Sequence, residues 1–314
     1  MAAAATGIAS GVRAADAARA KVFVIKESDR ARAVEACFEA LGFSCEGRAT
    51  ALKANFNSAD PFPASTHPDT LKALFVGLKK RKPGAITFAE RSGMGDTREV
   101  LKTTGAAAIA EKAGAKVRVL DEAPKEEWKR FEAEHWPQGF YAARTFTDAG
   151  CVVHTMCCKT HRFGGNVTLA LKNTIGLVAK RVPGIDHDFM RDLHGSPHQR
   201  AMIAEANVAW RPQLNVMDCL EAFTSGGPEA GTRVAPGVFL VSEDRCALDA
   251  AAIALLRLHG MKGPASEGPI GRTDQLARAI ALGIGAAPEH VEVLATHARA
   301  GDVAAKLAEQ LAPG

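Results

Sequence analysis

The chain has 314 residues, of which 47% are apolar and 24% are charged, and its formal net charge is +4. This composition is typical of a packed globular protein. The small positive charge argues against a nucleic-acid partner, because proteins that bind nucleic acid concentrate lysine and arginine on one face. No apolar run approaches the length that spans a membrane, so we expect no membrane partner either.

The cysteines and the N-terminal segment indicate the compartment. The seven cysteines are odd in number and follow no regular spacing, which is typical of proteins from a reducing environment. Residues 1–20 are rich in alanine, are interrupted by arginine and lack the apolar stretch of a secretory signal. We therefore expect a cytoplasmic protein with free thiols, in which residues 1–20 form a flexible tail.

Strand and helix patterns alternate through the first half of the chain. Apolar runs and helical spacing predict a strand at 21–26, a helix at 30–42, a strand at 48–56, a helix at 69–82, a strand at 85–90, a helix at 97–105 and a strand at 116–120. Asp96 stands where the N-cap of a helix is expected. Residues 121–145 are charged, aromatic and irregular, which predicts an inserted surface segment.

The same alternation continues to the end of the chain. The patterns predict a strand at 150–156, helices at 166–180 and 196–210, strands at 214–218 and 237–242, and helices at 244–258, 275–282 and 302–311. Continuously apolar strands that alternate with helices predict an α/β fold, with a largely parallel sheet and helices on both faces. We expect one domain in two halves over residues 21–314, with ligands beyond the carboxyl ends of the strands.

The first candidate cluster follows the strand predicted at 48–56. It consists of Lys53, Asn55 and Asn57, with Thr66 and His67 a little further on. Ammonium, amide and hydroxyl groups all donate hydrogen bonds to anionic oxygens. The same residues would also suit a polar loop that binds nothing. Their place at the carboxyl end of a strand favours a site for a small anionic ligand.

The second candidate cluster leaves the strand predicted at 85–90. It consists of Glu90, Arg91 and Ser92, followed by two glycines and then by Thr97 at the start of a helix. A helix N-terminus attracts anions, and glycines allow close backbone approach. The glycines lack the spacing of a Walker loop. The alternative is a glycine turn that leads to Asp96 as an N-cap.

The strongest candidate cluster follows the strand predicted at 150–156. It contains Cys157, Cys158, Lys159, Thr160 and His161. These residues place two thiols, an amine, a hydroxyl and an imidazole in a predicted loop with glycine hinges at positions 164 and 165.

Lys172 and Asn173 lie on the next predicted helix, among apolar neighbours. A lysine in such surroundings is seldom buried without a partner. Desolvation lowers its proton affinity, which suits a base, a nucleophile or a phosphate clamp. The alternative is that Lys172 extends along the surface to water.

Metal binding by Cys157, Cys158 and His161 is a second interpretation of the same cluster. Thiolate and imidazole are soft ligands for metal ions. Adjacent cysteines point apart on an extended chain, and they do not form the usual pair with two residues between them. The sequence also lacks the cysteine run of a self-contained ferredoxin cluster. A metal ion therefore stays an alternative cofactor.

The last candidates follow the strand predicted at 214–218. Asp218 and Glu221 would pair with Lys172 or orient His161, and Gly226 and Gly227 form a turn behind them.

Several of these motifs recur together in one family. They include Lys53-Ala54-Asn55, Thr66-His67-Pro68, Gly95-Asp96-Thr97, Lys159-Thr160-His161, Leu171-Lys172-Asn173 with Gly176, and Asp244 with Asp249. With these motifs the sequence resembles the bacterial and archaeal domain-of-unknown-function family 362 over residues 48–285. The resemblance implies no established activity. Some members append a ferredoxin module, which this sequence lacks, so we expect no iron–sulfur cluster of that kind.

A fainter similarity is to the nickel-pincer lactate racemase family. That family places a histidine shortly before a lysine that holds its cofactor, and His161 and Lys172 match this pair. The sequence departs from that family because no second catalytic histidine can be assigned.

Three functional hypotheses follow. The first is an enzyme that acts on a small anionic metabolite, in which Lys53, Lys159 and Lys172 supply positive potential and His161 moves a proton. In this hypothesis Asp218 or Glu221 orients His161. The second is an enzyme with a metal or organometallic cofactor, either an isomerase or an oxidoreductase. The third is a binding protein without catalysis. The sequence leaves open whether the chain forms a homo-oligomer.

Overall fold

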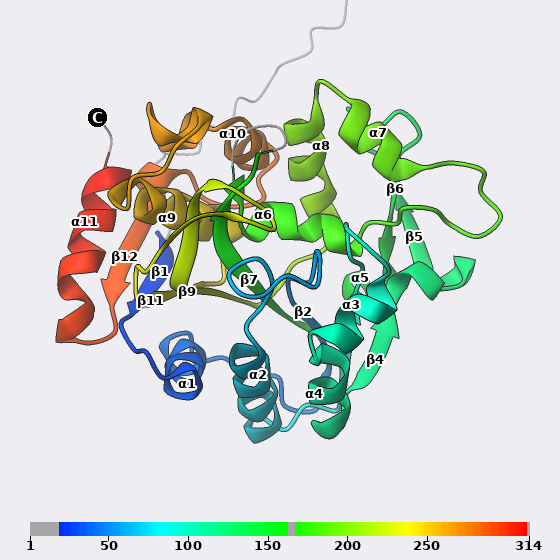
Figure 1. Cartoon of the computed structure of the whole chain (residues 1–314), viewed down its shortest axis with the longest axis horizontal. Coiled ribbons are helices and arrows are strands. Elements are labelled where there is room, and N and C mark those ends of the chain that lie inside the picture. The colour runs from blue at the N-terminus through cyan, green and yellow to red at the C-terminus, as the bar shows by residue number, and fades with distance from the viewer. Residues whose placement is uncertain (1–18, 163–166, 313–314) are drawn as a thin grey trace, which may run out of the picture.

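Residues 19–162 and 167–312 are described by the computed structural model. The path of its main sheet contains β1 (Ala20–Ile25), β2 (Ala49–Lys53), β3 (Ala85–Glu90), β4 (Lys116–Val119), β7 (Cys151–Thr160), β9 (Leu214–Gly226), β11 (Val238–Ser242) and β12 (Val291–Ala295). The strand order is β12-β1-β11-β9-β7-β2-β3-β4 (Figure 1). Two further strands extend the sheet, since β8 (Val167–Thr168) pairs with β7 and β10 (Gly231–Val234) pairs with β9.

Most neighbours in this sheet run parallel. From β9 through β7, β2 and β3 to β4, every pair of neighbouring strands is parallel, and β1 is parallel to β12. Only β11 in this path is antiparallel to its neighbours, β1 and β9. The predicted α/β fold with a largely parallel sheet is therefore confirmed.

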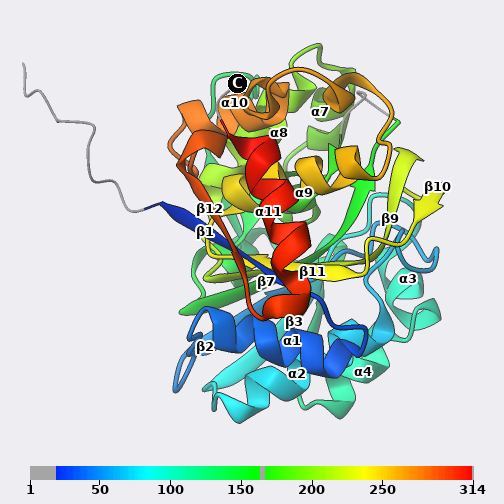
Figure 2. The same cartoon turned by 90° about the vertical axis from the view of Figure 1, so that its left-hand side faces the viewer.

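Alternating side chains along the strands fill a core on each face of the sheet. In β1, Val22 and Val24 face one core and Ile25 faces the other. One face carries α1 (Arg30–Ala40), α2 (Pro68–Lys80), α3 (Thr97–Thr103) and α4 (Ala106–Lys112). The other face carries α6 (Ala170–Asn173), α7 (Phe189–Gly195), α8 (Gln199–Ala206), α9 (Arg245–Leu258), α10 (Asp274–Ala281) and α11 (Gly301–Leu311) (Figure 2). The prediction of helices on both faces is confirmed.

The segment predicted as an insertion, residues 121–145, contains a small sheet of its own. Strands β5 (Trp128–Phe131) and β6 (Phe140–Ala143) pair antiparallel, and the short helix α5 (Arg144–Thr147) follows them. Trp136 and Phe140 are buried in the same core as residues of α7 and α8. The segment is thus packed against the face of the sheet that carries these helices.

Two elements beside the predicted strongest cluster differ from the sequence-based prediction. Strand β7 continues to Thr160, so Cys157 to Thr160 belong to the strand and not to a loop. The helix predicted at 166–180 is wrong. Only α6 is α-helical there, and a 3₁₀ turn at Thr174–Leu177 follows it. Pairing of β8 with β7 and a bridge between Ala142 and Val178 hold the two ends of this segment in extended structure.

Other differences are smaller. The helix predicted at 196–210 is shortened to α8, and α4, α7 and β12 were not predicted. Residues 1–18 of the expected tail, and Gly164 and Gly165 of the expected hinge, lie outside the described residues. Among the residues that the structure describes, no helix is long and apolar enough to cross a membrane.

Candidate functional site

The main cleft lies where several parallel strands end. Lys53 is the last residue of β2, Glu90 is the last residue of β3, and His161 directly follows β7. Because these strands are parallel neighbours, their carboxyl ends meet at one edge of the sheet. A cleft of about 1090 Å³ opens there, and these three residues line it together with Lys172 and Asn173.

A buried ion pair between Lys53 and Glu90 forms the floor of the cleft. Lys53 Nζ lies 2.7 Å from Glu90 Oε2 and also donates to the carbonyl of Ala54 at 2.6 Å. The other carboxylate oxygen, Glu90 Oε1, accepts from the backbone N–H of Ala54 at 2.7 Å. Burial lowers the pKa of Lys53 and raises the pKa of Glu90, and the contact between them opposes both shifts. Such a pair is stable only when its remaining donors and acceptors are satisfied.

Gly176 is required where the chain passes over this ion pair. A Cβ atom at this position would lie 2.7 Å from Lys53 Nζ. A larger side chain at this position would displace the ammonium of Lys53 from Glu90, so glycine lets the 3₁₀ turn at Thr174–Leu177 approach the floor without disturbing the ion pair.

Asn173 ties the segment after α6 to the sheet. Its Nδ2 lies 3.0 Å from the carbonyl of Ala54, 3.1 Å from the carbonyl of Thr155 and 2.9 Å from His154 Nε2. His154 Nδ1 lies 3.0 Å from Asn215 Oδ1. Burial holds the pKa of His154 well below its usual value, so this imidazole is neutral. The network assigns its proton to Nδ1, which leaves Nε2 to accept from Asn173.

Asp249 holds the beginning of α6 from helix α9. Its two carboxylate oxygens accept from the backbone N–H groups of Ala170 at 2.7 Å and Leu171 at 3.1 Å. Burial raises the pKa of this carboxyl group to about 7. Lys172 therefore sits on a segment that is fixed at both ends, by Asp249 before it and by Asn173 after it.

Lys172 lines the cleft and is half-buried. Among the described residues its side-chain amine makes no hydrogen bond or ion pair. Burial lowers its pKa to about 7, and the nearby charges of Arg200, Arg91 and Lys159 act in the same direction. Near neutral pH a large fraction of this amine is uncharged, so it can accept a proton or act as a nucleophile.

Arg91 supplies a buried positive charge to the same cleft. Its side chain is only 4% exposed, and it donates to the backbone carbonyl of Ile175. Its Nε has no hydrogen-bond partner, and within the described residues Arg91 forms no ion pair. Burial lowers its pKa to about 10, so it stays charged at neutral pH. A buried guanidinium that lines the cleft and forms no ion pair can bind an anion there.

The structure brings eight of the twenty predicted site residues to this cleft. Those that line it are Lys53, Asn55, Asn57, Glu90, Arg91, His161, Lys172 and Asn173. Those that do not are Thr66, His67, Ser92, Thr97, Cys157, Cys158, Lys159, Thr160, Asp218, Glu221, Gly226 and Gly227.

Lys159 is buried behind the cleft, beneath the loop that follows β2. Its Nζ donates to Asn55 Oδ1 at 2.9 Å, to the carbonyl of Pro63 at 3.3 Å and to the carbonyl of Ala64. Burial lowers its pKa. Lys159 thus positions the side chain of Asn55, which lines the cleft, and does not itself reach it.

Asp218 and Glu221 lie away from the cleft. Asp218 Oδ2 accepts from Arg30 Nε at 2.9 Å and from Thr70 Oγ1 at 2.6 Å, which connects β9 to α1 and α2. Glu221 forms a surface ion pair with Arg233 at 3.2 Å. Neither carboxylate is placed to pair with Lys172 in this cleft, because both face partners on other elements.

The hydroxyl and cap residues among the candidates hold the loops around the cleft. Thr66 Oγ1 accepts from the backbone N–H of Asn55 at 2.9 Å, and His67 caps α2. Ser92 Oγ donates to the carbonyl of Phe56 at 2.7 Å, and Thr97 Oγ1 donates to Asp121 at 2.5 Å. These bonds fix the loop that follows Lys53 and the loop that carries Arg91.

The glycine turn after β9 supports the loop of His161. Gly227 has a φ of 74°, and a Cβ atom there would collide with the carbonyl of Thr160. Its own carbonyl accepts from the backbone N–H of Arg162 at 3.2 Å. Gly226 also has a positive φ, of 75°. The turn of Gly226 and Gly227 therefore packs against the residues on either side of His161.

The structure does not bring Cys157, Cys158 and His161 together as metal ligands. All seven cysteines are buried and free, and the two adjacent thiols alternate across strand β7. Burial raises the pKa of Cys157 to about 12, which disfavours the thiolate that a metal would bind. Within the described residues, the three do not form a group with ligand atoms in common reach.

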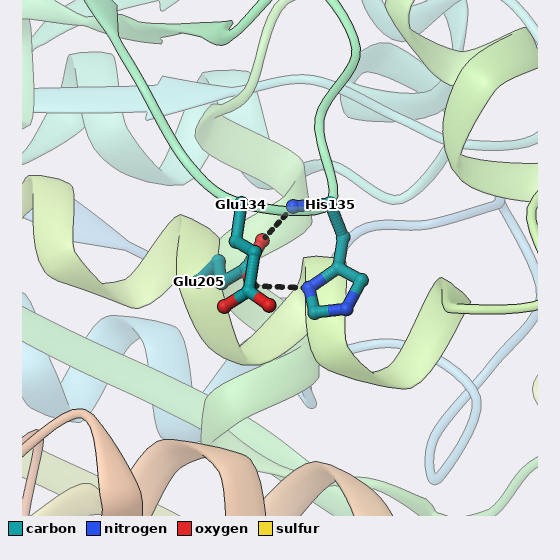
Figure 3. A group of neighbouring side chains, drawn as sticks. All are labelled: Glu134, His135 and Glu205. Carbon is teal, nitrogen blue, oxygen red and sulfur yellow. Dashed lines mark hydrogen bonds and ion pairs between the residues drawn. The ribbon is translucent and has the colours of Figure 1, made fainter.

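Another group does have its ligand atoms within 4.8 Å of one another, and it consists of Glu134, His135 and Glu205 (Figure 3). His135 Nδ1 lies 2.6 Å from Glu205 Oε1. Arg278 Nη2 already lies 2.6 Å from a carboxylate oxygen of both Glu134 and Glu205. The guanidinium supplies the positive charge that a cation would bring. This cluster therefore connects residues 134–135 to α8 and α10.

Several residues that line the cleft were not predicted to be site residues. They are Asp121, Lys180, Arg181, Asp188, Met190, His194, Arg200 and Asp274. Lys180 and Arg181 pair with Asp121 and Asp188, at 3.4 Å and 3.3 Å. The only feature of the sequence that could have pointed to one of them is a charged residue close to the start of a predicted helix. Arg200 is such a residue, because it lies near the start of α8. Asp274 gave no signal, because α10 follows all the candidate motifs.

Comparisons with known proteins place these residues in a family. The family model described as Domain of unknown function (DUF362) matches residues 50–254, more than half of the chain. No curated protein matches the chain. A solved structure to which the chain is similar is the lactate racemase apoprotein from Thermoanaerobacterium thermosaccharolyticum, with 14% sequence identity and a TM-score of 0.42. That similarity covers 72% of this chain and 54% of the racemase chain. The resemblance to family 362 expected from the sequence is confirmed.

Proposed function

The chain belongs to the family described as Domain of unknown function (DUF362), and for this member we propose an enzyme that acts on a small anionic metabolite in the main cleft. The observation that carries the proposal is the pair of cations Arg91 and Lys172. Both line the cleft, and among the described residues neither forms an ion pair. A buried positive charge is costly unless an anion compensates it, so a bound anion is the partner that fits this site.

The proposed roles follow from the surroundings of each side chain. Arg91, which lines the cleft, binds an anionic oxygen of the metabolite through its guanidinium. Lys172 exchanges a proton with the metabolite, since its pKa of about 7 lets both protonation states exist near neutral pH. His161 lines the same cleft and moves a second proton. Asn173 keeps Lys172 in place through its bonds to the sheet.

Binding of anions to the purified chain tests the first part of the proposal. We expect at least one member of a panel of monocarboxylates, dicarboxylates and phosphate to bind, measured by calorimetry below pH 7, where Lys172 is charged. In Lys172→Met the affinity for that anion should fall about tenfold or more, because a charge-assisted hydrogen bond contributes about 1.5–3 kcal/mol. Lys72→Met is the matched control, because Lys72 is exposed on α2 and pairs only with Asp69.

Turnover separates an enzyme from a protein that only binds. If His161 moves a proton, His161→Ala lowers turnover of the anion found above much more than its affinity. Equal losses of turnover and of affinity would show that His161 contributes to binding and not to proton transfer. The proposal fails if no anion in the panel binds, or if Lys172→Met binds that anion as tightly as the parent chain does.

A further inference from the structure

Lys172 differs from the other lysines of the cleft in what its amine contacts. The lysines that line the cleft are Lys53, Lys172 and Lys180. Lys53 forms an ion pair with Glu90 at 2.7 Å, and Lys180 forms an ion pair with Asp121 at 3.4 Å. Among the residues that the structure describes, Lys172 alone of these three makes no hydrogen bond or ion pair. Its amine is thus open to a ligand from the cleft.

We propose that Lys172 forms an imine with the carbonyl carbon of an oxo acid bound in the cleft. The inference rests on the proposed function, since it takes the anion bound by Arg91 to be the carboxylate of this acid. It adds the substrate class and a covalent step. An unpaired lysine amine next to other cations is the arrangement that activates lysine as a nucleophile toward carbonyl groups.

The surroundings of Lys172 favour its uncharged form, which is the form that attacks carbon. Burial is the largest cause of its lowered pKa, and the charges of Arg200, Arg91 and Lys159 add to it. The charged and titratable residues that share the cleft or act on Lys172 are Lys53, Glu90, Arg91, Asp121, Lys159, His161, Lys180, Arg181, Asp188, His194, Arg200 and Asp274. Cations outnumber carboxylates in this set, so a ligand that brings a carboxylate also offsets their charge.

The chemistry of the anion narrows the substrate class. A phosphate monoester or a simple carboxylate offers the amine no electrophilic carbon. An oxo acid offers both parts, a carboxylate for Arg91 and a carbonyl carbon for Lys172. Both side chains line one cleft, and the charge of Arg91 acts on the amine of Lys172, so the proposal places both groups on one small molecule.

The step is balanced without an oxidant, a reductant or a second substrate. The lone pair on Lys172 Nζ attacks the carbonyl carbon, and a carbon–nitrogen bond forms while the carbonyl π electrons move to oxygen. A proton passes from nitrogen to that oxygen, and His161 is the group in the cleft that can move it. A second proton converts the hydroxyl into water, which leaves as the nitrogen lone pair completes the C=N bond. One amine, one carbonyl and one proton, taken up from solvent, thus give one protonated imine and one water.

Reductive trapping on the purified full chain tests the proposal. The chain is incubated with pyruvate, 2-oxoglutarate, oxaloacetate or acetoacetate, and sodium borohydride then reduces any imine to a stable secondary amine. We expect the intact mass to increase by one reduced adduct for at least one acid, and peptide mapping to place it on Lys172. Trapping should rise with pH around the pKa of Lys172, about 7.

Two variants make the assignment specific. Lys172→Arg keeps a positive charge but removes the amine, so the adduct should be lost. Lys72→Arg, on the exposed surface of α2, should keep the full adduct. An adduct that persists in Lys172→Arg, or that lies on another lysine, overturns the imine proposal.

Failure of the imine proposal is distinguishable from failure of the proposed function. Calorimetry with the same four acids, without borohydride, reports binding independently of trapping. If none of the acids gives an adduct on Lys172, the imine is overturned whether or not they bind. If they or other anions bind with a loss in Lys172→Met, the anion site stands without a covalent step.

Discussion

Lys53 and Lys172 line the same cleft, but the protein holds them in opposite ways. Lys53 belongs to the floor, where Glu90 pairs with it at 2.7 Å and both side chains are fully buried. Lys172 belongs to the wall, where it is half-buried and, among the described residues, has no hydrogen bond or ion pair. The comparison separates two uses of a desolvated charge: a compensated charge stabilises the fold, and an uncompensated one is available to a ligand.

Removing the charge of Glu90 should have the largest effect on stability. Glu90→Gln leaves the ammonium of Lys53 buried without its anion, so the free energy of unfolding should fall by about 3–5 kcal/mol. Urea denaturation measures it. Glu99→Gln is the control, because Glu99 is exposed and its ion pair with Lys102 is long, at 3.6 Å. A loss no larger than that of the control would mean that the floor is not a compensated pair.

Asn173 connects the floor of the cleft to its wall. Its replacement should lower the free energy of unfolding by less than the replacement of Glu90 does. Asn173→Ala leaves the carbonyl of Ala54 and Nε2 of His154 without this donor, which should lower the free energy of unfolding by about 1–3 kcal/mol. Ligand affinity should fall as well, because Lys172 is the neighbouring residue. Urea denaturation beside Gln138→Ala, an exposed amide, gives the baseline. Equal stability of both variants would show that the network contributes nothing.

Replacement of Lys172 should mainly change how the free energy of unfolding depends on pH. Its pKa is about 7 in the folded chain against an ordinary value of 10.5, so between these values the unfolded state binds more protons. Lys172 therefore makes the parent chain more stable as the pH rises through this range. The Lys172→Met variant loses this contribution to the pH dependence, because methionine does not titrate. Its stability relative to the parent should be highest below pH 7 and should decrease toward pH 10. Thermal unfolding at several pH values measures this, and a constant difference would refute the lowered pKa.

Glu221 should give the smallest effect. Its ion pair with Arg233 is on the surface and outside the cleft, so Glu221→Gln should alter the free energy of unfolding by about 0.5 kcal/mol or less. Affinity for the anion should also stay unchanged in calorimetry. A clear loss of affinity in this variant would show that Glu221 takes part in anion binding, as its position in the sequence predicted.

The part of the site that could be predicted from sequence is the part that depends on strand ends. Lys53, Glu90 and His161 each stand at or directly after an apolar run, and parallel neighbours bring such positions to one edge. Asp218 and Glu221 stand in the same kind of position, yet they miss the cleft. The register of β9 against β7 shifts between Cys157 and Cys158, opposite Asp218 and Ala222. A register irregularity of this kind changes the direction in which the following side chains point. It cannot be predicted from the pattern of apolar residues in the sequence.

The environment of Lys172 could not be predicted in full, because partners far along the chain decide it. Residues 166–180 have the apolar character of a buried helix, but β8 and the bridge to Ala142 hold the two ends of this segment as extended chain. Asp249 then fixes the one short helix that remains. Arg200 belongs to yet another element. Helical periodicity reports only local preference, and these long-range contacts override it.

The position of β1 has a consequence for how the chain folds. β1 follows immediately after the first residues described, yet it pairs with β11 on one side and with β12 on the other, and Ala20 lies opposite Val291. During synthesis one backbone edge of this strand therefore stays unpaired until β11, and the other until β12, has left the ribosome. Pairings between such distant segments are slow to form, and exposed strand edges favour aggregation meanwhile. We expect the nascent chain to depend on chaperones more than a chain whose first strand pairs with its second.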